Sequence, residues 1–261
     1  MRSPLNYLGG KSRLASRIVP LIPSDHTCYC EPFCGAAWVL FSKKPSHSEV
    51  INDADGELVT FWRIVQNHLE EFLRYYKWAV TSRKLFEIES AKRPETLTDV
   101  QRAVKYFYCQ RLGFGGHTDK RTFGYSTTSP SRLSVASIEE RLLEVHWRLD
   151  GVWIEHLDAI DCIRRYDRPS TIFYIDPPYF GTAGYAIKWT CVDFIRLRKA
   201  LDSVKGRFIL SLNDVPDVRR IFHGFRMRQV RLAYSVSNGR EPCSGRDVSR
   251  AELLIDNIPK R

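Results

Sequence analysis

Four consecutive residues, Asp176-Pro177-Pro178-Tyr179, are of types that could bind and activate an amino group. They directly follow an apolar run, residues 170–175, whose β-branched and aromatic side chains predict a buried parallel strand. Because proline has no backbone N–H to donate, the chain must leave the sheet here, at the carboxyl end of the strand, where open α/β sheets bind ligands. A carboxylate, a rigid turn and an aromatic ring could hold a flat, amino-bearing substrate there, although Asp-Pro-Pro also occurs as an ordinary turn.

The turn at residues 31–37 (EPFCGAA) is a second candidate ligand site. Its small residues would let a ligand approach the backbone and the N-terminus of the following helix, although a tightly packed turn has the same composition. Asp53 and Asp55 follow the next predicted strand, where a carboxylate can accept hydrogen bonds from ribose hydroxyls. The two features together predict an adenosine-containing cofactor. A further glycine turn, residues 7–11 (YLGGK), is compatible with either a phosphate nest or a plain N-terminal turn.

These motifs need a sheet whose strands end at one edge, and the apolar patterning predicts one. We expect short strands at residues 28–30, 50–51, 152–154, 171–175, 207–212, 227–236 and 251–256, with helices at 11–20, 38–41 and 192–204 between them. The long middle part differs, because residues 57–111 have almost wholly helical spacing and residues 138–149 predict another amphipathic helix. The pattern therefore predicts an α/β domain built from both ends of the chain, with a mostly helical insertion between them.

The composition is that of a globular protein with an excess of positive charge. The 261 residues carry a net charge of +10, which favours a polyanionic partner and above all nucleic acid, although it could also serve only solubility. No apolar stretch approaches the ~20 residues that span a bilayer, and the N-terminus lacks the apolar core of a signal peptide, so we expect a cytoplasmic protein without a membrane partner. The seven cysteines, an odd number without paired CxxC spacing, predict reduced thiols and no metal site.

Five short motifs occur in an order that resembles one enzyme family. They are residues 6–11 (NYLGGK), residues 31–35 (EPFCG), Asn52-Asp53, Asp158 and Asp176-Pro177-Pro178-Tyr179. This order is similar to that of the Dam-like (class alpha) DNA adenine-N6 methyltransferases, over nearly the whole chain. The resemblance implies a Rossmann-like, S-adenosylmethionine-dependent catalytic domain at residues 1–57 plus 150–261. It also implies a target-recognition, DNA-binding domain at residues 58–149, mostly helical and carrying a β-hairpin.

The resemblance also implies which residues hold the cofactor, S-adenosylmethionine. Its methionine end is expected beside Tyr7, Gly10 and Lys11 and the loop residues Glu31, Pro32, Phe33 and Gly35. Asp53 is expected to bind the ribose, Asp158 to lie near the adenine ring of the cofactor, and Asp176 to border the same pocket. The loop departs from the family in one respect, because bulky Trp38 stands where a small residue is common.

For catalysis, the resemblance implies that double-stranded DNA extrudes an adenine into the turn formed by Asp176, Pro177, Pro178 and Tyr179, since N6 cannot be reached inside a stacked duplex. Asp176 and the carbonyl of Pro177 would accept hydrogen bonds from the N6 amino group, which frees its lone pair to attack the sulfonium methyl. Tyr179 would stack on the extruded base. Such catalysis depends on positioning and electrostatics, without a covalent intermediate or a metal.

The DNA contacts are expected in a basic stretch rich in glycine, threonine and serine, residues 111–132. Its candidate contacts to phosphates or guanines are Arg111, Lys120, Arg121 and Arg132. Residues 117–121 (HTDKR) do not match the pattern of proteins that read GATC, so the recognition sequence stays open and relaxed specificity is an option. A second basic run, residues 226–250, is expected to form strands and a loop beside the active site. The pair Asn213-Asp214 is expected either near the substrate or in a plain turn.

Three functions are compatible with the sequence. The first is methylation of adenine N6 in DNA. Methylation of cytosine N4 would use the same turn, although it more often goes with serine in place of Asp176. A non-catalytic DNA-binding protein could keep the fold, but the presence of Asp53, Asp176, Pro177 and Tyr179 favours an enzyme. The sequence assigns neither an oligomeric state nor a role such as restriction-modification.

Overall fold

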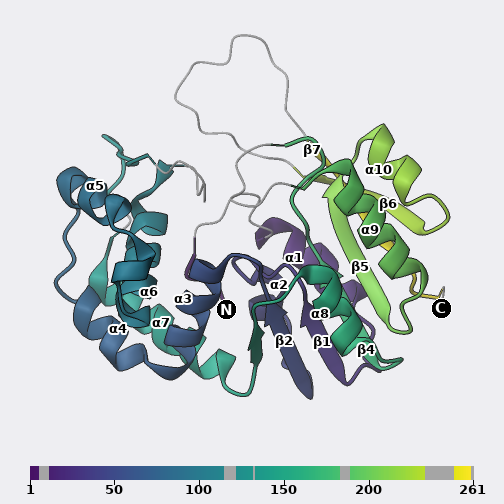
Figure 1. The fold of residues 1–261 in the computed structure, drawn as a ribbon, viewed down its shortest axis with the longest axis horizontal. Helices are drawn as coiled ribbons and strands as arrows, with labels where there is room; N and C mark the ends of the chain where they lie inside the picture. The colour runs from purple at the N-terminus through teal and green to yellow at the C-terminus, as the bar shows by residue number, and fades with distance from the viewer. Residues whose placement is uncertain (6–11, 115–121, 132, 183–188, 233–249, 260–261) are drawn as a thin grey trace, which may run out of the picture.

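A mixed β-sheet forms the centre of the molecule (Figure 1). The computed structural model describes residues 1–5, 12–114, 122–131, 133–182, 189–232 and 250–259. Its seven-stranded sheet has the order β3-β2-β1-β4-β5-β7-β6, with β1 (Cys28–Glu31), β2 (Ser48–Asn52), β3 (Trp153–Glu155), β4 (Thr171–Ile175), β5 (Arg207–Asn213), β6 (Arg226–Leu232) and β7 (Arg250–Asp256). Neighbours from β3 to β5 pair in parallel, whereas β7 is antiparallel to both β5 and β6. The predicted Rossmann-like α/β fold is confirmed.

Helices cover both faces of this sheet, because successive strand residues point to opposite sides. Ile172 and Tyr174 of β4 pack in a core that includes α1 (Ser12–Ile18) and α2 (Trp38–Ser42). Their neighbours Phe173 and Ile175 pack on the opposite side, where the covering helices are α8 (Ala159–Tyr166), α9 (Cys191–Asp202) and α10 (Pro216–Ile221). The result is a three-layer arrangement in which β4 is buried along its whole length, as its apolar run predicted. We call the side covered by α1 and α2 the α1 face.

The segment between β2 and β3 is helical, as predicted, and Figure 1 shows it gathered beside the β3 edge of the sheet. Its helices are α3 (Gly56–Asn67), α4 (Leu69–Tyr76), α5 (Arg83–Ala91), α6 (Asp99–Leu112) and α7 (Val135–Leu149). Aromatic rings from three of them make its core, where Phe61 stacks on Phe107 at 5.3 Å and Phe72 packs edge-on against Phe107 at 5.7 Å. Thr98 begins α6 with a capping box, which fixes where this helix starts.

Two short helices, α8 and α10, were missed in the sequence, because each offers only about two turns of apolar periodicity. The predicted helix at residues 11–20 is α1 followed by a 3₁₀ turn at Val19–Leu21, where Pro20 lacks the N–H that would continue an α-helix. The long helical stretch is likewise interrupted by a 3₁₀ turn at Pro94–Thr96. A proline therefore interrupts both of these helical stretches.

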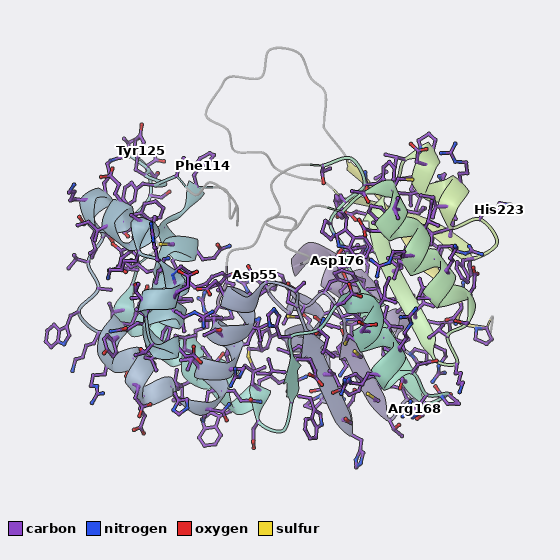
Figure 2. All side chains as sticks on the ribbon, viewed as in Figure 1. Asp55, Phe114, Tyr125, Arg168, Asp176 and His223 are labelled. Atoms are coloured by element: carbon purple, nitrogen blue, oxygen red, sulfur yellow. The ribbon has the colours of Figure 1, made fainter. Side chains whose placement is uncertain are left out.

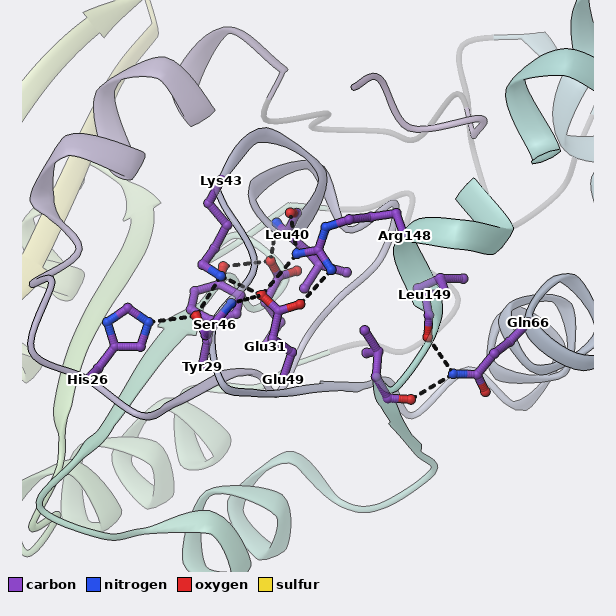
Figure 3. Close-up of polar contacts among 11 residues, drawn as sticks. His26, Tyr29, Glu31, Leu40, Lys43, Ser46, Glu49, Gln66, Arg148 and Leu149 are labelled. Atoms are coloured by element: carbon purple, nitrogen blue, oxygen red, sulfur yellow. Dashed lines mark hydrogen bonds and ion pairs between the residues drawn. The ribbon is translucent and has the colours of Figure 1, made fainter. Parts of the chain in front are cut away.

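A buried group of charges joins the helical segment to the sheet (Figure 3). Arg148 of α7 donates to both carboxylate oxygens of Glu49 in β2, at 2.5 and 2.9 Å, and to the carbonyl of Leu40 at 3.1 Å. Lys43 contacts the same carboxylate at 2.5 Å. Burial alone would raise the pKa of Glu49, but hydrogen bonds from Arg148 and Lys43 lower it below its ordinary value. The carboxylate is therefore ionised and compensated on both sides, which fastens α7 to β2.

No described helix combines the length and apolarity needed to cross a membrane. Within the same ranges, no three His, Cys, Asp or Glu side chains gather as a metal-binding group. The described cysteines are free thiols, and Cys30 and Cys162 lie 3.8 Å apart between their sulfur atoms. Burial raises the pKa of Cys30 well above its ordinary value, which keeps that thiol protonated and unreactive.

Candidate active site

The strand order reverses between β1 and β4, which are neighbours in the sheet. From β1 the chain proceeds outward to β2 and β3, and from β4 it proceeds the other way to β5. The crevice at the carboxyl ends of two such strands is the ligand site of open α/β sheets. Glu31 ends β1 and Asp176 directly follows β4, so both lie at this crevice. Figure 2 shows Asp176 and Asp55 at the same edge of the sheet.

The loop after β1 is held by the residues that end β2. The backbone N–H of Gly35 donates to Asp53 Oδ2 at 2.9 Å, and the side-chain amide of Asn52 donates to the carbonyl of Pro32 at 2.9 Å. Gly35 has φ +46°, a conformation that favours glycine and brings the backbone to the crevice without a side chain. Burial raises the pKa of Asp53 to about 6, although backbone hydrogen bonds oppose the rise. The loop is therefore a preformed cradle with one carboxylate at its rim.

Glu31 is a buried acid at the base of this cradle, only 1% exposed. Its Oε1 accepts two hydrogen bonds, from the hydroxyl of Tyr29 at 2.6 Å and from the backbone N–H of Leu40 at 2.7 Å. Burial is nevertheless the stronger influence and raises the pKa of Glu31 to about 7, with the charge of Asp176 contributing in the same direction. A cationic ligand beside Glu31 would lower this pKa and favour the ionised carboxylate.

The turn after β4 is held by β5 and β7. Ser211 donates to Asp176 Oδ1 at 2.8 Å, and the oxygen of Ser211 lies 3.0 Å from the hydroxyl of Tyr174. Because the Ser211 proton is used on Asp176, Tyr174 is the donor of the second bond. The hydroxyl of Tyr179 donates to Glu252. The prolines between Asp176 and Tyr179 restrict the backbone of this turn.

Three carboxylates surround Tyr174 on the α1 face. Burial raises the pKa of Tyr174 well above its ordinary value, and the charges of Asp176, Glu31 and Glu252 raise it further. Glu31 belongs to β1, Glu252 belongs to β7 and Asp176 directly follows β4, so these acids meet only in the folded protein. Two of them, Glu31 and Asp176, lie at the crevice between β1 and β4, and their negative charge there favours a cationic ligand.

Two further acids from the sequence act as helix caps. Asp55 begins α3 and accepts from the backbone of Glu57 at 3.0 Å, so of the two ribose candidates Asp53 is the one at the cradle. Asp158 begins α8, where its Oδ1 accepts from the backbone of Ile160 at 2.9 Å while its side chain is exposed. It follows β3 and therefore lies at the same edge of the sheet as Asp53.

A row of aromatic rings joins the loops after β1 and β4. Phe33 meets Trp189 edge-on at 5.0 Å, Trp189 meets Phe194 at 5.3 Å, and Phe194 lies 5.2 Å from Phe180. Phe33, Phe180 and Trp189 are only partly buried. They offer an apolar wall for a flat ring beside the acidic crevice.

Part of the predicted site falls outside the described residues: Tyr7, Gly10, Lys11, Lys120, Arg121 and Arg132. Arg111 is described and is half-buried, with one guanidinium nitrogen donating to the carbonyl of Pro4 at 3.5 Å. A β-bridge between Gly113 and Phe123 closes the base of the predicted hairpin. Beside it, the guanidinium of Arg83 lies over the rings of Phe123 and Tyr125, at 4.8 and 5.5 Å from their centroids.

The prediction that the second basic run lies beside the site is wrong for its first two arginines. Arg226 and Arg228 both pair with the buried Asp256. Asp256 is in register with Ile209, whereas the carboxyl end of β5 at Asn213 is in register with Glu252. The two arginines therefore stabilise the opposite end of the sheet.

Three residues that hold the turn after β4 were not predicted, namely Tyr174, Ser211 and Glu252, whereas Asn213 was expected either near the substrate or in a plain turn. For Ser211 and Asn213 a signal existed, because polar residues two apart at the end of an apolar strand share one face. Asn213 does lie at the site, since its side chain accepts from the backbone N–H of Phe180 at 3.0 Å and donates to the carbonyl of Phe180 at 3.1 Å. Glu252 gave no signal, because nothing in the sequence indicates that β7 lies next to β5.

Comparison with known proteins relates this chain to one protein family. Residues 7–236 match the model of the D12 class N6 adenine-specific DNA methyltransferases. The type II methyltransferase M.CviBI of Paramecium bursaria Chlorella virus NC1A is 24% identical over 98% of this chain and 100% of its own length. The type II methyltransferase M1.LlaDCHI of Lactococcus lactis subsp. cremoris is also 24% identical, over 98% and 95% of the two chains. A DNA adenine methylase of Haemophilus influenzae is 24% identical over 91% and 88%.

Proposed function

Because this chain belongs to the D12 class of N6 adenine-specific DNA methyltransferases, we propose that its catalytic turn receives an adenine extruded from DNA and that the methyl donor is S-adenosylmethionine. The reaction of the family is methylation of adenine N6 in DNA, and the Haemophilus influenzae relative is named a DNA adenine methylase. The observation that carries the proposal is the meeting of Asp176 with the cradle after β1 at one crevice of the sheet.

The donor fits the residues of this crevice. S-adenosylmethionine supplies an electrophilic methyl group on a positively charged sulfur, and it also carries an ammonium group. The carboxylates of Glu31 and Asp176 match these charges, and Asp53 would accept from the ribose while Gly35 leaves room for the ligand at the backbone. Phe33 would contact the adenosine ring, with Asp158 nearby and the predicted Tyr7, Gly10 and Lys11 at the methionine end.

The target base would enter the turn after β4. Asp176 and the carbonyl of Pro177 would accept hydrogen bonds from the N6 amino group and hold its lone pair toward the methyl group. Ser211 supports the geometry because it anchors one oxygen of Asp176 at 2.8 Å. Tyr179 would stack on the base, which must leave the duplex to reach this depth.

Residues 58–149 would recognise DNA. The net charge of +10 supports a polyanionic substrate. We propose Arg111, Lys120, Arg121 and Arg132 as contacts, and Arg83 as an addition, because it presents its charge over two rings at the base of the hairpin. Tyr125 is 77% exposed there and is available for stacking on nucleic acid.

Radiolabelled methyl transfer to unmethylated genomic DNA tests the proposal. We expect Asp176→Ala to lower turnover by at least about a thousandfold, because the acceptor for the N6 proton is lost, while calorimetric binding of S-adenosylmethionine weakens far less. Asp25→Ala is the matched control, since Asp25 pairs with Arg207 at the amino end of the sheet, away from the crevice.

Near-normal transfer by the Asp176→Ala variant would overturn the catalytic assignment. Chromatography of the digested product separates N6-methyladenine from N4-methylcytosine, and the second product would favour the cytosine alternative. Failure of the wild-type chain to bind the donor would favour a non-catalytic DNA-binding protein. Sequencing with base-modification detection, in a methylation-free host that expresses the chain, would identify the target sequence.

A further inference from the structure

One cross-strand pair stands at the carboxyl end of β5. Asn213 of β5 and Glu252 of β7 are register partners in the antiparallel ladder, so their side chains lie on the same face of the sheet. Ser211 is two residues earlier in β5 and shares this face. It is the α1 face, because Ile209 and Leu254, which occupy the same alternating positions, belong to the core that includes α1.

Each of these three side chains holds a different part of the catalytic turn. Ser211 donates to the carboxylate of Asp176, and Asn213 makes two hydrogen bonds with the backbone of Phe180. Glu252 accepts from the hydroxyl of Tyr179. Tyr179 is therefore fixed at its tip by β7 and at the following peptide by β5.

Glu252 is a buried acid in a mostly apolar strand. Its side chain is 1% exposed, and its neighbours along β7 include Leu253, Leu254 and Ile255. A carboxylate loses its hydration at such a position, so an apolar residue would be the less costly occupant. The hydroxyl of Tyr179 donates a hydrogen bond that partly offsets this cost.

We propose that Glu252 is a positioning residue for methyl transfer, which sets the direction of the Tyr179 ring on which the extruded adenine stacks. This inference depends on the proposed function of the turn. Glu252 accepts from Tyr179 and stands on β7 beside Asn213, separated from β1 by β4 and β5, so its loss should reduce turnover and leave the affinity for the donor unchanged. A charged acceptor holds a phenol more firmly than a neutral one, which makes the carboxylate better than an amide.

A double-mutant cycle tests the coupling, with tritiated S-adenosylmethionine and unmethylated genomic DNA as substrates. Tyr179→Phe removes the donor hydroxyl, and Glu252→Gln keeps the shape and one acceptor oxygen. We expect kcat to fall about tenfold in the first variant and about threefold in the second. In the double variant kcat should stay within about twofold of Tyr179→Phe alone, because the lost contact is the same.

A second tyrosine–carboxylate pair provides the control. Tyr166 of α8 donates to Glu155 of β3 at 2.6 Å, and neither residue contacts the catalytic turn in the described structure. Tyr166→Phe and Glu155→Gln should leave kcat unchanged. In all variants the calorimetric dissociation constant for S-adenosylmethionine should stay within about twofold of wild type, which also shows that the cradle is folded.

The inference is overturned if Glu252→Gln leaves kcat at the wild-type value, or lowers it equally with and without the Tyr179 hydroxyl. If that variant does not bind the donor, Glu252→Met replaces it in the same cycle and is judged by the same two results. Failure of the proposed function is seen separately, because the wild-type chain would then transfer no methyl group to adenine. That result overturns the inference as well.

Discussion

Glu31→Gln separates the stability of this protein from its function. Glu31 is 1% exposed, and its pKa is raised to about 7 mainly by burial. A folded-state pKa above the unfolded value means that stability from this group is fully present below pH ~4.5 and is lost as the pH rises through ~7. From an ordinary value of 4.5 to about 7, ionisation costs the folded protein about 3 kcal/mol at pH 8, at ~1.4 kcal/mol for each pKa unit.

Glutamine removes that cost. Its side-chain oxygen can still accept from Tyr29 and Leu40, and it stays neutral at every pH. In urea denaturation we expect the variant to be more stable than wild type by up to about 3 kcal/mol at pH 8, and by less than about 1 kcal/mol at pH 5. Equal stability of the two proteins at both pH values would refute the assignment of a raised pKa.

The same substitution should weaken donor binding, because the sulfonium and ammonium groups lose a carboxylate. For wild type we expect the dissociation constant of S-adenosylmethionine to rise about tenfold from pH 8 to pH 6, as Glu31 becomes protonated. The Glu31→Gln variant should bind more weakly at pH 8 and depend less on pH. S-adenosylhomocysteine, whose sulfur is neutral, should lose less affinity than the donor. Calorimetry with both ligands measures this, and unchanged donor affinity in the variant would refute a role of Glu31 at the cofactor.

Two further substitutions test how the site is supported. Arg148→Met should destabilise the protein by about 3 kcal/mol in urea denaturation, because Glu49 loses its bidentate partner in a buried position. The control Arg164→Met breaks an exposed ion pair and should destabilise the protein by less than about 0.5 kcal/mol. Equal effects would contradict the role of the buried network. Asn52→Ala should lower the free energy of unfolding by about 2 kcal/mol and weaken donor binding, because Asn52 joins the carbonyl of Pro32 to the backbone of Leu157. The control is Asn67→Ala, which removes an exposed side chain. Donor affinity at the wild-type level in Asn52→Ala would argue against a positioning role.

The local pattern of residues was sufficient to predict the fold class and the place of the turn that follows β4. The β-branched and aromatic run before Asp176 predicted a buried strand, and the prolines after it had to end that strand at the edge where ligands bind. The aromatic and aliphatic spacing of the insertion predicted its helices for the same reason, since burial on one face imposes a period on the sequence. Short helices such as α8 escaped prediction because two turns carry too little periodic signal.

Long-range contacts could not be predicted in this way. Whether Asp55 or Asp53 borders the cradle depends on which one caps α3, and Arg148 meets Glu49 only because α7 returns to β2. The sequence by itself determined the turn at residues 176–179, because proline and alternating apolar residues act on their immediate neighbours. Only the tertiary structure decided what holds that turn, because Glu252 reaches Tyr179 through the pairing of β7 with β5, and strand pairing depends on contacts between residues far apart in the chain.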